Sequence, residues 1–246
     1  RDYKVTGVQT CALPILMPLL ALTLISDVRH QFIQLTTAKV DVVTVPMSSG
    51  TYRVDVILPS GFPGTDEDFA SMVKRPGLVA AINGAYFDRN SKKPIGDLWS
   101  GGKLRHFGAM GTALTVTADG TLDIARVQRH KRVDWSAYET VLACGPALVL
   151  DGEIDCDPAS EGFRDPAVMG RVPRMGIGYT DAGDLLLVRC AKAVSFHEFA
   201  FVMRQIGCRE AMNLDSGASS ALWMEGKMIV PAGRRLTNVL GVFAKS

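Results

Sequence analysis

The most informative chemical group in this 246-residue sequence is the carboxylate of Asp215, in the segment NLDSGASSALW (213–223). Aspartic proteases present a catalytic acid in a similar way, on a tight turn that continues with Ser or Thr and Gly. Such enzymes need two carboxylates about 3 Å apart that share one proton. Only Asp215 occupies a turn of this kind, and little sequence follows it. The protease is therefore the less favoured interpretation, and it requires a dimer that pairs two copies of Asp215.

Asp215 belongs to the last of four polar, glycine-containing segments that interrupt otherwise apolar sequence. These are AAINGAYFDRNSKKPIGDLWSGGKL (80–104), CGPALVLDGE (144–153), RVPRMGIGYTDAGDLLLV (171–188) and GCREAMNLDSGASSALW (207–223), and RLTNVLGVF (235–243) follows them. In order and spacing, the segments resemble the phosphodiester glycosidase family over residues 38–243. The family pattern is Asn-Gly-x-x-Phe, Gly-Pro-x-Leu, an Arg before a Gly-containing apolar strand, and Asn-Leu-Asp-Gly-Gly-x-Ser-Ser after a helix that ends in Leu-Gly-Cys. Each motif alone is weak, but five in this order are specific.

The match to this pattern is close, with three departures. The matching residues are Asn83, Gly84, Phe87, Gly145, Pro146, Arg174, Gly207, Cys208, Asn213, Leu214, Asp215, Gly217, Ser219 and Ser220. The departures are Ser216, where the family most often has Gly, Ala218 in the following small position, and Ile206 before the glycine. Because only Gly takes positive φ freely, Ser216 narrows the conformations of the turn.

The resemblance implies cleavage of a sugar–phosphate bond through an oxocarbenium-like transition state. This chemistry needs a carboxylate, for which we select Asp215, and a cation that holds the phosphate, for which we select Arg174. Asp97 is the candidate for a second acid/base group. The sugar would be held by Asn83, Gly84, Tyr86, Phe87, His106, Asn213, Ser216, Gly217, Ser219 and Ser220. No cofactor is certain, although a divalent metal near Asp215 would help to hold a phosphodiester.

Each of these residues also has a purely structural alternative. Asp215 would then cap its own turn, and Arg174 would form a surface ion pair. Asn83 and Asn213 would brace strands made otherwise of apolar residues, since a buried amide must find hydrogen-bond partners. Phe87 would pack in the core.

We therefore expect hydrolysis of a sugar-1-phosphodiester, such as an N-acetylglucosamine-1-phosphodiester, in a glycan or exopolysaccharide. The partner is a phosphorylated saccharide or polysaccharide. The alternative is a non-catalytic glycan-binding or polysaccharide-assembly module on the same fold. A net charge of +2 and only one short basic stretch, at residues 126–132, argue against nucleic-acid binding.

The elements that position these residues are mostly strands. Residues 39–45 and 52–58 alternate apolar and polar side chains, as half-buried strands do. Turn signals at Asp119-Gly120, Asp151-Gly152, 181–183 and Glu225-Gly226 each separate two apolar runs and so predict hairpins. The sequence therefore predicts a single α+β domain with a large, mostly antiparallel β-sheet system and few helices.

Two helices are expected. The first begins near Thr65, where Thr65 and Asp68 resemble a capping box, and it stops before Pro76. The second is capped by Ser195, with Glu198 at the reciprocal position, and ends at Gly207.

The N-terminus has a different character from the rest. Residues 5–15 resemble the in-frame translation of a sequencing adapter, so we interpret residues 1–15 as an artefact. Residues 16–37 would be a residual export signal or an N-terminal strand, and residues 38–246 the glycosidase-like domain. The apolar run at 16–26 is too short to span a bilayer. We expect export to the periplasm or the extracellular space.

The four cysteines outside this segment leave two interpretations open. They show no CxxC spacing of a zinc or redox site. In an exported protein Cys144–Cys156 and Cys190–Cys208 are conceivable disulfides, and buried free thiols are the alternative.

Overall fold

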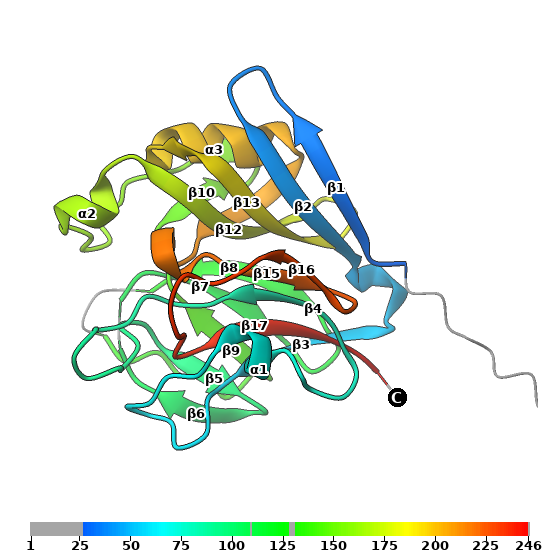
Figure 1. Ribbon diagram of the computed structural model, residues 1–246, viewed down its shortest axis with the longest axis vertical. Helices are drawn as coiled ribbons and strands as arrows, with labels where there is room; N and C mark the ends of the chain where they lie inside the picture. The colour runs from blue at the N-terminus through cyan, green and yellow to red at the C-terminus, as the bar shows by residue number, and fades with distance from the viewer. Residues whose placement is uncertain (1–26, 109, 128–130, 246) are drawn as a thin grey trace, which may run out of the picture.

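The computed structural model describes residues 27–108, 110–127 and 131–245, which form three antiparallel sheets and three short helices (Figure 1). This architecture confirms the predicted mostly antiparallel fold with few helices. Our interpretations of residues 1–15 and 16–26 lie outside the described residues. Within the remainder of the 16–37 segment, residues Arg29–Gln34 form the edge strand β1.

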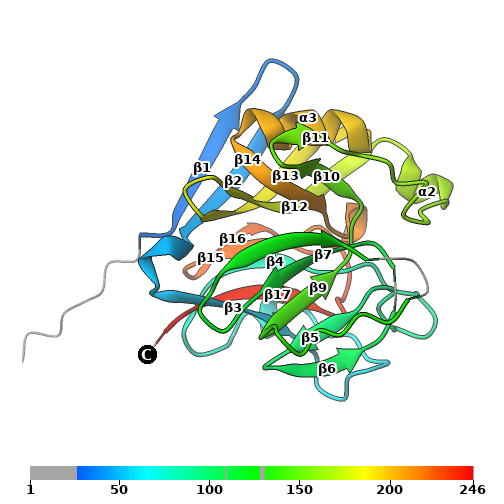
Figure 2. The same cartoon turned by 180° about the vertical axis from the view of Figure 1, so that it is seen from behind.

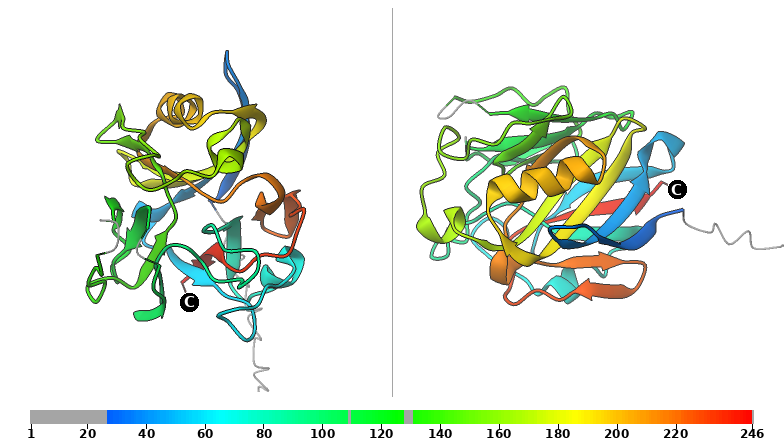
Figure 3. Two further views of the ribbon diagram at one scale, coloured as in Figure 1. Left: turned by 90° about the vertical axis from the view of Figure 1, so that its left-hand side faces the viewer. Right: turned by 90° about the horizontal axis from the view of Figure 1, so that it is seen from above.

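The largest sheet has seven strands. Their order is β1 (Arg29–Gln34), β2 (Lys39–Pro46), β13 (Asp184–Val194), β12 (Val172–Thr180), β14 (Cys208–Asn213), β10 (Ala147–Leu150) and β11 (Glu153–Ile154). Helix α3 (Phe196–Gln205) lies along the outer face of this sheet (Figures 1 and 3). Phe199 and Met203 of α3 pack there with Val188 of β13 in one apolar cluster.

Two five-stranded sheets lie on the opposite face of the large sheet (Figures 1 and 2). One has the order β16 (Lys227–Val230), β15 (Leu222–Met224), β4 (Leu78–Asn83), β17 (Val239–Ala244) and β3 (Tyr52–Ile57). The other has the order β6 (Lys103–His106), β5 (Leu98–Ser100), β9 (Thr140–Ala143), β7 (Thr112–Val116) and β8 (Leu122–Arg126). All three sheets contribute to one buried core, which includes Val43, Ile82 and Leu142.

The four predicted hairpin turns are confirmed between β7 and β8, β10 and β11, β12 and β13, and β15 and β16. Two of them are two-residue turns in which both central residues have positive φ: Asp151 (50°) with Gly152 (77°), and Glu225 (43°) with Gly226 (83°). Positive φ at both positions is the mark of a type I′ turn, whose twist matches that of the strands it joins.

The helix predictions have opposite outcomes. Helix α3 carries the predicted capping box, in which the Ser195 side chain accepts from the Glu198 N–H and the Glu198 side chain accepts from the Ser195 N–H. The predicted start of the first helix at Thr65 is wrong, because α1 spans only Phe69–Met72. Residue 67 instead forms a β-bridge with Leu236, and the Thr65 hydroxyl donates to the Ser60 carbonyl. This long-range bridge holds the segment extended where the local sequence favours a helical turn.

The remaining elements are short. Helix α2 (Pro166–Met169) begins at Asp165, whose side chain accepts from the Ala167 N–H, and 3-10 turns occupy Met47–Ser49 and Gly217–Ser219. No helix in the described residues is long and apolar enough to cross a membrane. The four described cysteines are all free thiols, so neither conceivable disulfide is formed.

Candidate active site

Asparagine side chains join the ends of three strands and so position Asp215. Asn83, the last residue of β4, donates from Nδ2 to the Asp215 carbonyl (2.6 Å) and accepts from the Ala221 N–H (3.0 Å). Asn238, directly before β17, accepts from the Ala85 N–H (2.6 Å). These amides are buried among apolar strands, so their hydrogen bonds fix the backbone on both sides of Asp215.

Gly84 is required by this close packing. A Cβ atom at this position would lie 2.0 Å from Oδ1 of Asn238. This distance is a steric clash, so no residue with a side chain fits here. The Gly84 carbonyl accepts from the Asp215 N–H (3.1 Å), and the Gly84 N–H donates to the Asn238 carbonyl (3.2 Å). The end of β4, the segment after β14 and the segment before β17 therefore meet at one point.

The Asp215 carboxylate is buried and held by three groups. Oδ2 accepts from Nη2 of Arg234 (3.0 Å), and Oδ1 accepts from the Ser216 N–H (2.8 Å). Ser219 hydrogen-bonds to the same carboxylate and accepts from Nε of Arg234 (2.6 Å). Burial raises the pKa of Asp215, while Ser219, Arg234 and the Ser216 N–H oppose that rise. The acid is thus a desolvated group supported by one cation.

Arg174 is fully buried, which rules out the surface ion pair as its role. Its guanidinium lies 3.6 Å from the centroid of the Phe196 ring, and it donates to the carbonyls of Val194 (3.2 Å), Val168 (3.1 Å) and Gly170 (2.6 Å). Nη1 of Arg174 is buried without a well-formed hydrogen bond to any described residue, and the Tyr86 side chain interacts with the guanidinium. Burial lowers the pKa of this guanidinium. A buried cation with an incompletely bonded donor is a binding group for an anion.

Asp215 and Arg174 line the same cavity, of about 150 Å³, beside α2. The cavity is also lined by Tyr86, Ser216 and Gly217 from the predicted site, and by Arg89 and Arg234. Tyr86 is fixed from behind by Asn213, whose Nδ2 donates to the Tyr86 hydroxyl (2.8 Å). Three guanidinium groups and two carboxylates, those of Asp215 and of Asp165, which caps α2, therefore line a small hollow at the ends of β14 and β12.

The model of the phosphodiester glycosidase family matches residues 76–243. This chain belongs to the phosphodiester glycosidase family. No curated protein matches it in a sequence search.

Solved structures share the fold of this phosphodiester glycosidase family chain at low identity. The zebrafish N-acetylglucosamine-1-phosphodiester alpha-N-acetylglucosaminidase catalytic domain, auto-inhibited by its pro-peptide, superposes with a TM-score of 0.70 and 20% identity, over 89% of this chain and 83% of that one. A hypothetical protein from Synechocystis gives 0.67 and 16%, over 89% of this chain and 62% of that one. A Burkholderia pseudomallei protein described as exported gives 0.64 and 15%, over 84% and 74%. This chain thus spans less than two thirds of the Synechocystis protein.

Other predicted site residues of this glycosidase-family chain lie behind the cavity. Asn83, Gly84 and Asn213 support it, as described above. The Arg234 guanidinium lies over the Phe87 ring, 4.8 Å from its centroid, so Phe87 makes a cation–π contact with that arginine. Ser219 bonds Asp215 and Arg234, and the buried Ser220 hydroxyl has no partner among the described residues. Oδ1 of Asn213 likewise has none.

The last two predicted residues, Asp97 and His106, lie at another sheet, away from this cavity. Asp97, directly before β5, is fully buried and lines a separate cavity, where it accepts from the Gly108 N–H (2.8 Å) and from the Trp135 indole (2.8 Å). His106 ends β6 on the same sheet, and burial lowers its pKa. Neither side chain lines the hollow that contains Asp215. Asp97 therefore fixes the Trp135 indole in a cavity that shares no lining residue with the Asp215 cavity.

Sequence reasoning missed Arg234, Arg89 and Asn238. Asn238 carried a usable signal, because it is a buried amide at the end of an apolar strand, as Asn83 and Asn213 are. Arg234 stands in the pair Arg234-Arg235, which has the composition of a solvated surface run. Only the tertiary structure separates the two: Arg235 bonds to Asp66 and Asp68 at the surface, while Arg234 turns to Asp215.

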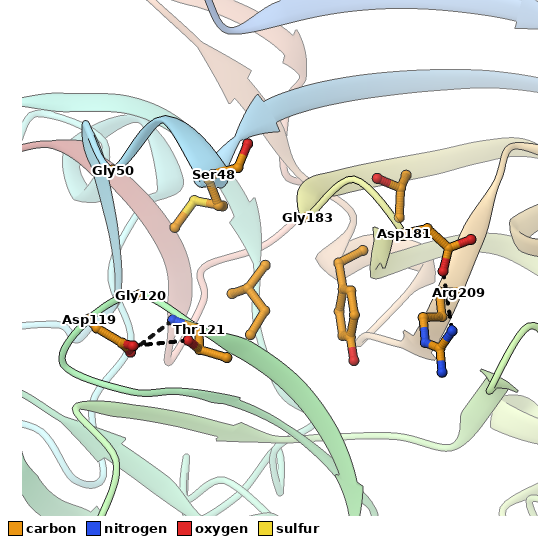
Figure 4. Close-up of a pocket in the computed structure, with 12 residues that line it drawn as sticks. Ser48, Gly50, Asp119, Gly120, Thr121, Asp181, Gly183 and Arg209 are labelled. Atoms are coloured by element: carbon orange, nitrogen blue, oxygen red, sulfur yellow. Dashed lines mark hydrogen bonds and ion pairs between the residues drawn. The ribbon is translucent and has the colours of Figure 1, made fainter.

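A wider cavity of about 360 Å³ lies at the far end of β12 (Figure 4). Its polar groups already have partners: Asp119 accepts from Thr121 within its own turn, and Arg209 of β14 is paired with Asp181 of the turn between β12 and β13. Most of these groups are exposed. Size alone therefore does not mark the active site, and the desolvated, converging charges favour the smaller cavity.

The described residues bear on whether a divalent metal could be held near Asp215. They contain no group of three or more His, Cys, Asp or Glu side chains placed to hold an ion. The cations that line the Asp215 cavity are side chains of the chain itself, Arg89, Arg174 and Arg234.

Proposed function

We propose that this protein hydrolyses a sugar-1-phosphodiester, such as an N-acetylglucosamine-1-phosphodiester, within a glycan or exopolysaccharide. The observation that supports the proposal is that Asp215 and Arg174 line one cavity of a phosphodiester glycosidase family chain. A desolvated acid and a desolvated cation are the two groups that bond cleavage at a phosphorylated anomeric carbon requires.

Asp215 is the proposed catalytic carboxylate. Its ionised form stabilises positive charge on the anomeric carbon or activates a water for attack on it. Arg234, Ser219 and the Ser216 N–H fix both carboxylate oxygens, so that the group needs no reorganisation during the reaction. Because burial disfavours the charged form, Arg234 also maintains the carboxylate that the reaction uses.

Arg174 is the proposed phosphate ligand, through Nη1. Its other donors are committed to the carbonyls of Val194, Val168 and Gly170, and these bonds hold the guanidinium in place before substrate binds. Arg89 and Arg234 add positive charge to the same cavity. A phosphate held by cations is a good leaving group, so cleavage has little need of a general acid, and the separate location of Asp97 and His106 agrees with this mechanism.

The sugar would contact the polar groups that line the rest of the cavity. Tyr86 offers a ring and a hydroxyl whose position Asn213 fixes, while Ser216 and Gly217 present the turn after Asp215. Gly217 has φ of 64°, and its missing side chain lets substrate approach the backbone. Since one structural relative is described as exported, we place this reaction in the periplasm or outside the cell.

Release of sugar from N-acetylglucosaminyl-phosphomethyl tests the proposal. We expect turnover by the native chain and a loss of about 10³-fold in Asp215→Asn, because an amide cannot carry the required charge. Asp181→Asn is the matched control, since Asp181 is an exposed acid at the far end of β12, and it should leave the rate unchanged. Saturable binding of this compound by the native chain without any turnover would support the glycan-binding module in its place.

A further inference from the structure

We propose that the cavity containing Asp97 is a second carbohydrate subsite, which binds a neutral pyranose of the glycan that carries the scissile phosphodiester. The cavity measures about 400 Å³ and lies on the sheet formed by β5–β9. Its walls include Trp99, Phe107 and Trp135. This inference takes the identity of the ligand from the proposed function, but its site shares no residue with the Asp215 cavity.

The two indole rings are fixed before any ligand binds. Nε1 of Trp135 donates to Asp97 (2.8 Å), and Nε1 of Trp99 donates to the Tyr138 carbonyl (2.8 Å). Trp135 is also packed edge-on against Tyr138, with 5.9 Å between the ring centroids. Trp135 is only 4% exposed and packs in a buried cluster, so the partly buried Trp99, whose indole N–H is already bonded, is the ring that can offer a ligand apolar surface. The C–H faces of a pyranose ring are the surface that such rings bind.

Solvent-exposed apolar side chains complete the opening of the cavity. Leu104 is 46% exposed and Phe107 is 37% exposed, and few other large apolar side chains among the described residues are so open to water. Exposed apolar groups around a hollow of ligand size are typical of a binding site. Burial against a sugar would remove this apolar surface from water.

Polar groups at the rim suit the hydroxyls of a sugar. The Arg132 guanidinium is stacked 4.6 Å from the centroid of the Phe107 ring and forms no ion pair with any other described residue. Its donors are therefore free to bind hydroxyl oxygens. Asp134 lies on the same rim, where its Oδ1 accepts from the Ser136 N–H (3.0 Å), and its carboxylate is the acceptor group of this cavity. One donor and one acceptor group beside stacked rings give a site for a neutral, hydroxylated ring better than one for an anion, because the two charges offset each other.

The proposed substrate needs such a second subsite. The Asp215 cavity, at about 150 Å³, is smaller than the ~300–1,000 Å³ typical of ligand pockets, so it can hold only the reacting part of a glycan. A single hairpin connects the two cavities: Tyr86 lines the first, and its carbonyl accepts from the Ile95 N–H (3.0 Å), two residues before Asp97 in the second. A rigid connection of this kind would hold distant parts of one glycan in register.

Tryptophan fluorescence can test this subsite, because two of the three tryptophans of the chain line it. We would titrate the protein with the neutral trisaccharides N-acetylated chitotriose, mannotriose and maltotriose. We expect at least one of them to change the emission saturably in the millimolar range. Phe107→Ala and Arg132→Ala should each weaken that binding about three- to tenfold, as expected for the loss of one stacking or one polar contact. Phe32→Ala, which removes another exposed phenylalanine (59% exposed) on strand β1, should not change it.

The same titration in Asp215→Asn separates this inference from the proposed function. A response that persists in Asp215→Asn and weakens in Phe107→Ala supports the subsite, whether or not the native chain turns over a phosphodiester. No response to any of the three sugars would overturn it. A response that is lost in Asp215→Asn but intact in Phe107→Ala would also overturn it, because the sugar would then occupy the Asp215 cavity alone.

Discussion

The polar side chains at the two ends of strand β12 differ in burial and in pairing. At the first end, Arg174 and Asp215 are buried, and Nη1 of Arg174 lacks a well-formed hydrogen bond to any described residue. At the far end, Arg209 is largely exposed and pairs with Asp181 (Figure 4) and also with Asp151. The far cavity is the wider of the two, at about 360 Å³ against about 150 Å³.

This contrast indicates that desolvation with incomplete pairing marks the functional end. Keeping a guanidinium and a carboxylate out of water lowers stability, and a folded chain retains such an arrangement where a ligand completes it. Exposed ion pairs such as those of Arg209 lower the free energy little, because water already solvates each charge. The following predictions test this difference, from the largest expected effect to the smallest.

Arg174→Lys should damage both activity and stability. A single ammonium cannot reach the carbonyls of Val194, Val168 and Gly170 and also stack on Phe196, so buried acceptors lose their donor. We expect a loss of about 10³-fold in kcat/KM and of about 2–4 kcal/mol in the free energy of unfolding. Urea unfolding and turnover measure the two effects. Arg209→Lys is the control. Equal losses of kcat/KM and of unfolding free energy in the two variants would show that burial does not distinguish the two ends of β12.

Arg234→Gln should reduce activity and change its dependence on pH. Arg234 lowers the pKa of Asp215 against the effect of burial, so its loss raises that pKa further. Less of the carboxylate is then ionised at a given pH, and the acid limb of the kcat/KM profile should move to higher pH. At neutral pH we expect a loss of about ten- to a hundredfold.

The adjacent arginine provides the control for this variant. Arg235→Gln removes a cation that pairs with Asp66 and Asp68 at the surface, so it should leave the pH profile in place. An acid limb that stays unchanged in Arg234→Gln would mean that Asp215 is not the group whose ionisation limits the rate.

The sequence predicts local features well where neighbours along the chain decide them. The Ser195–Glu198 capping box and the turn at Asp151-Gly152 form as expected, because each depends on a few consecutive residues. Prediction fails where a distant partner decides. Local capping signals near Thr65 are overridden by the bridge to Leu236, from the other end of the chain.

The candidate site shows the same limit. The order of the family motifs was enough to select Asp215 and Arg174, which line one cavity. It could not show that Arg234, in a run of two arginines, faces Asp215, since nothing local distinguishes a buried arginine from a solvated one. Nor could it show that Asp97 accepts a hydrogen bond from the indole of Trp135. The sequence does not distinguish an aspartate that binds substrate from one that holds a neighbouring side chain in place.

Asp215→Asn should stabilise the protein at neutral pH. The pKa of Asp215 is raised in the folded state, so folded chains bind this proton more tightly than unfolded ones, and the native protein loses stability as pH rises through that pKa. An amide avoids the burial of charge, and the half-buried Arg234 can still reach water. We expect a gain of about 1 kcal/mol in urea unfolding at neutral pH. The gain should disappear in acid, below the pKa of the unfolded carboxyl, and a variant less stable than the native chain at neutral pH would contradict this account.

Arg209→Met should have the smallest effect, although it breaks two ion pairs. Both partners, Asp151 and Asp181, are exposed and lie on hairpin turns, and water replaces the lost contacts at little cost. At physiological salt we expect no measurable change in the midpoint of thermal unfolding or in turnover. Any effect seen at low ionic strength should fade as salt is added, since exposed charges are screened. A large, salt-independent loss of stability would show that the far end of β12 is held by its charges as tightly as the Asp215 end, and desolvation would then no longer distinguish the functional end.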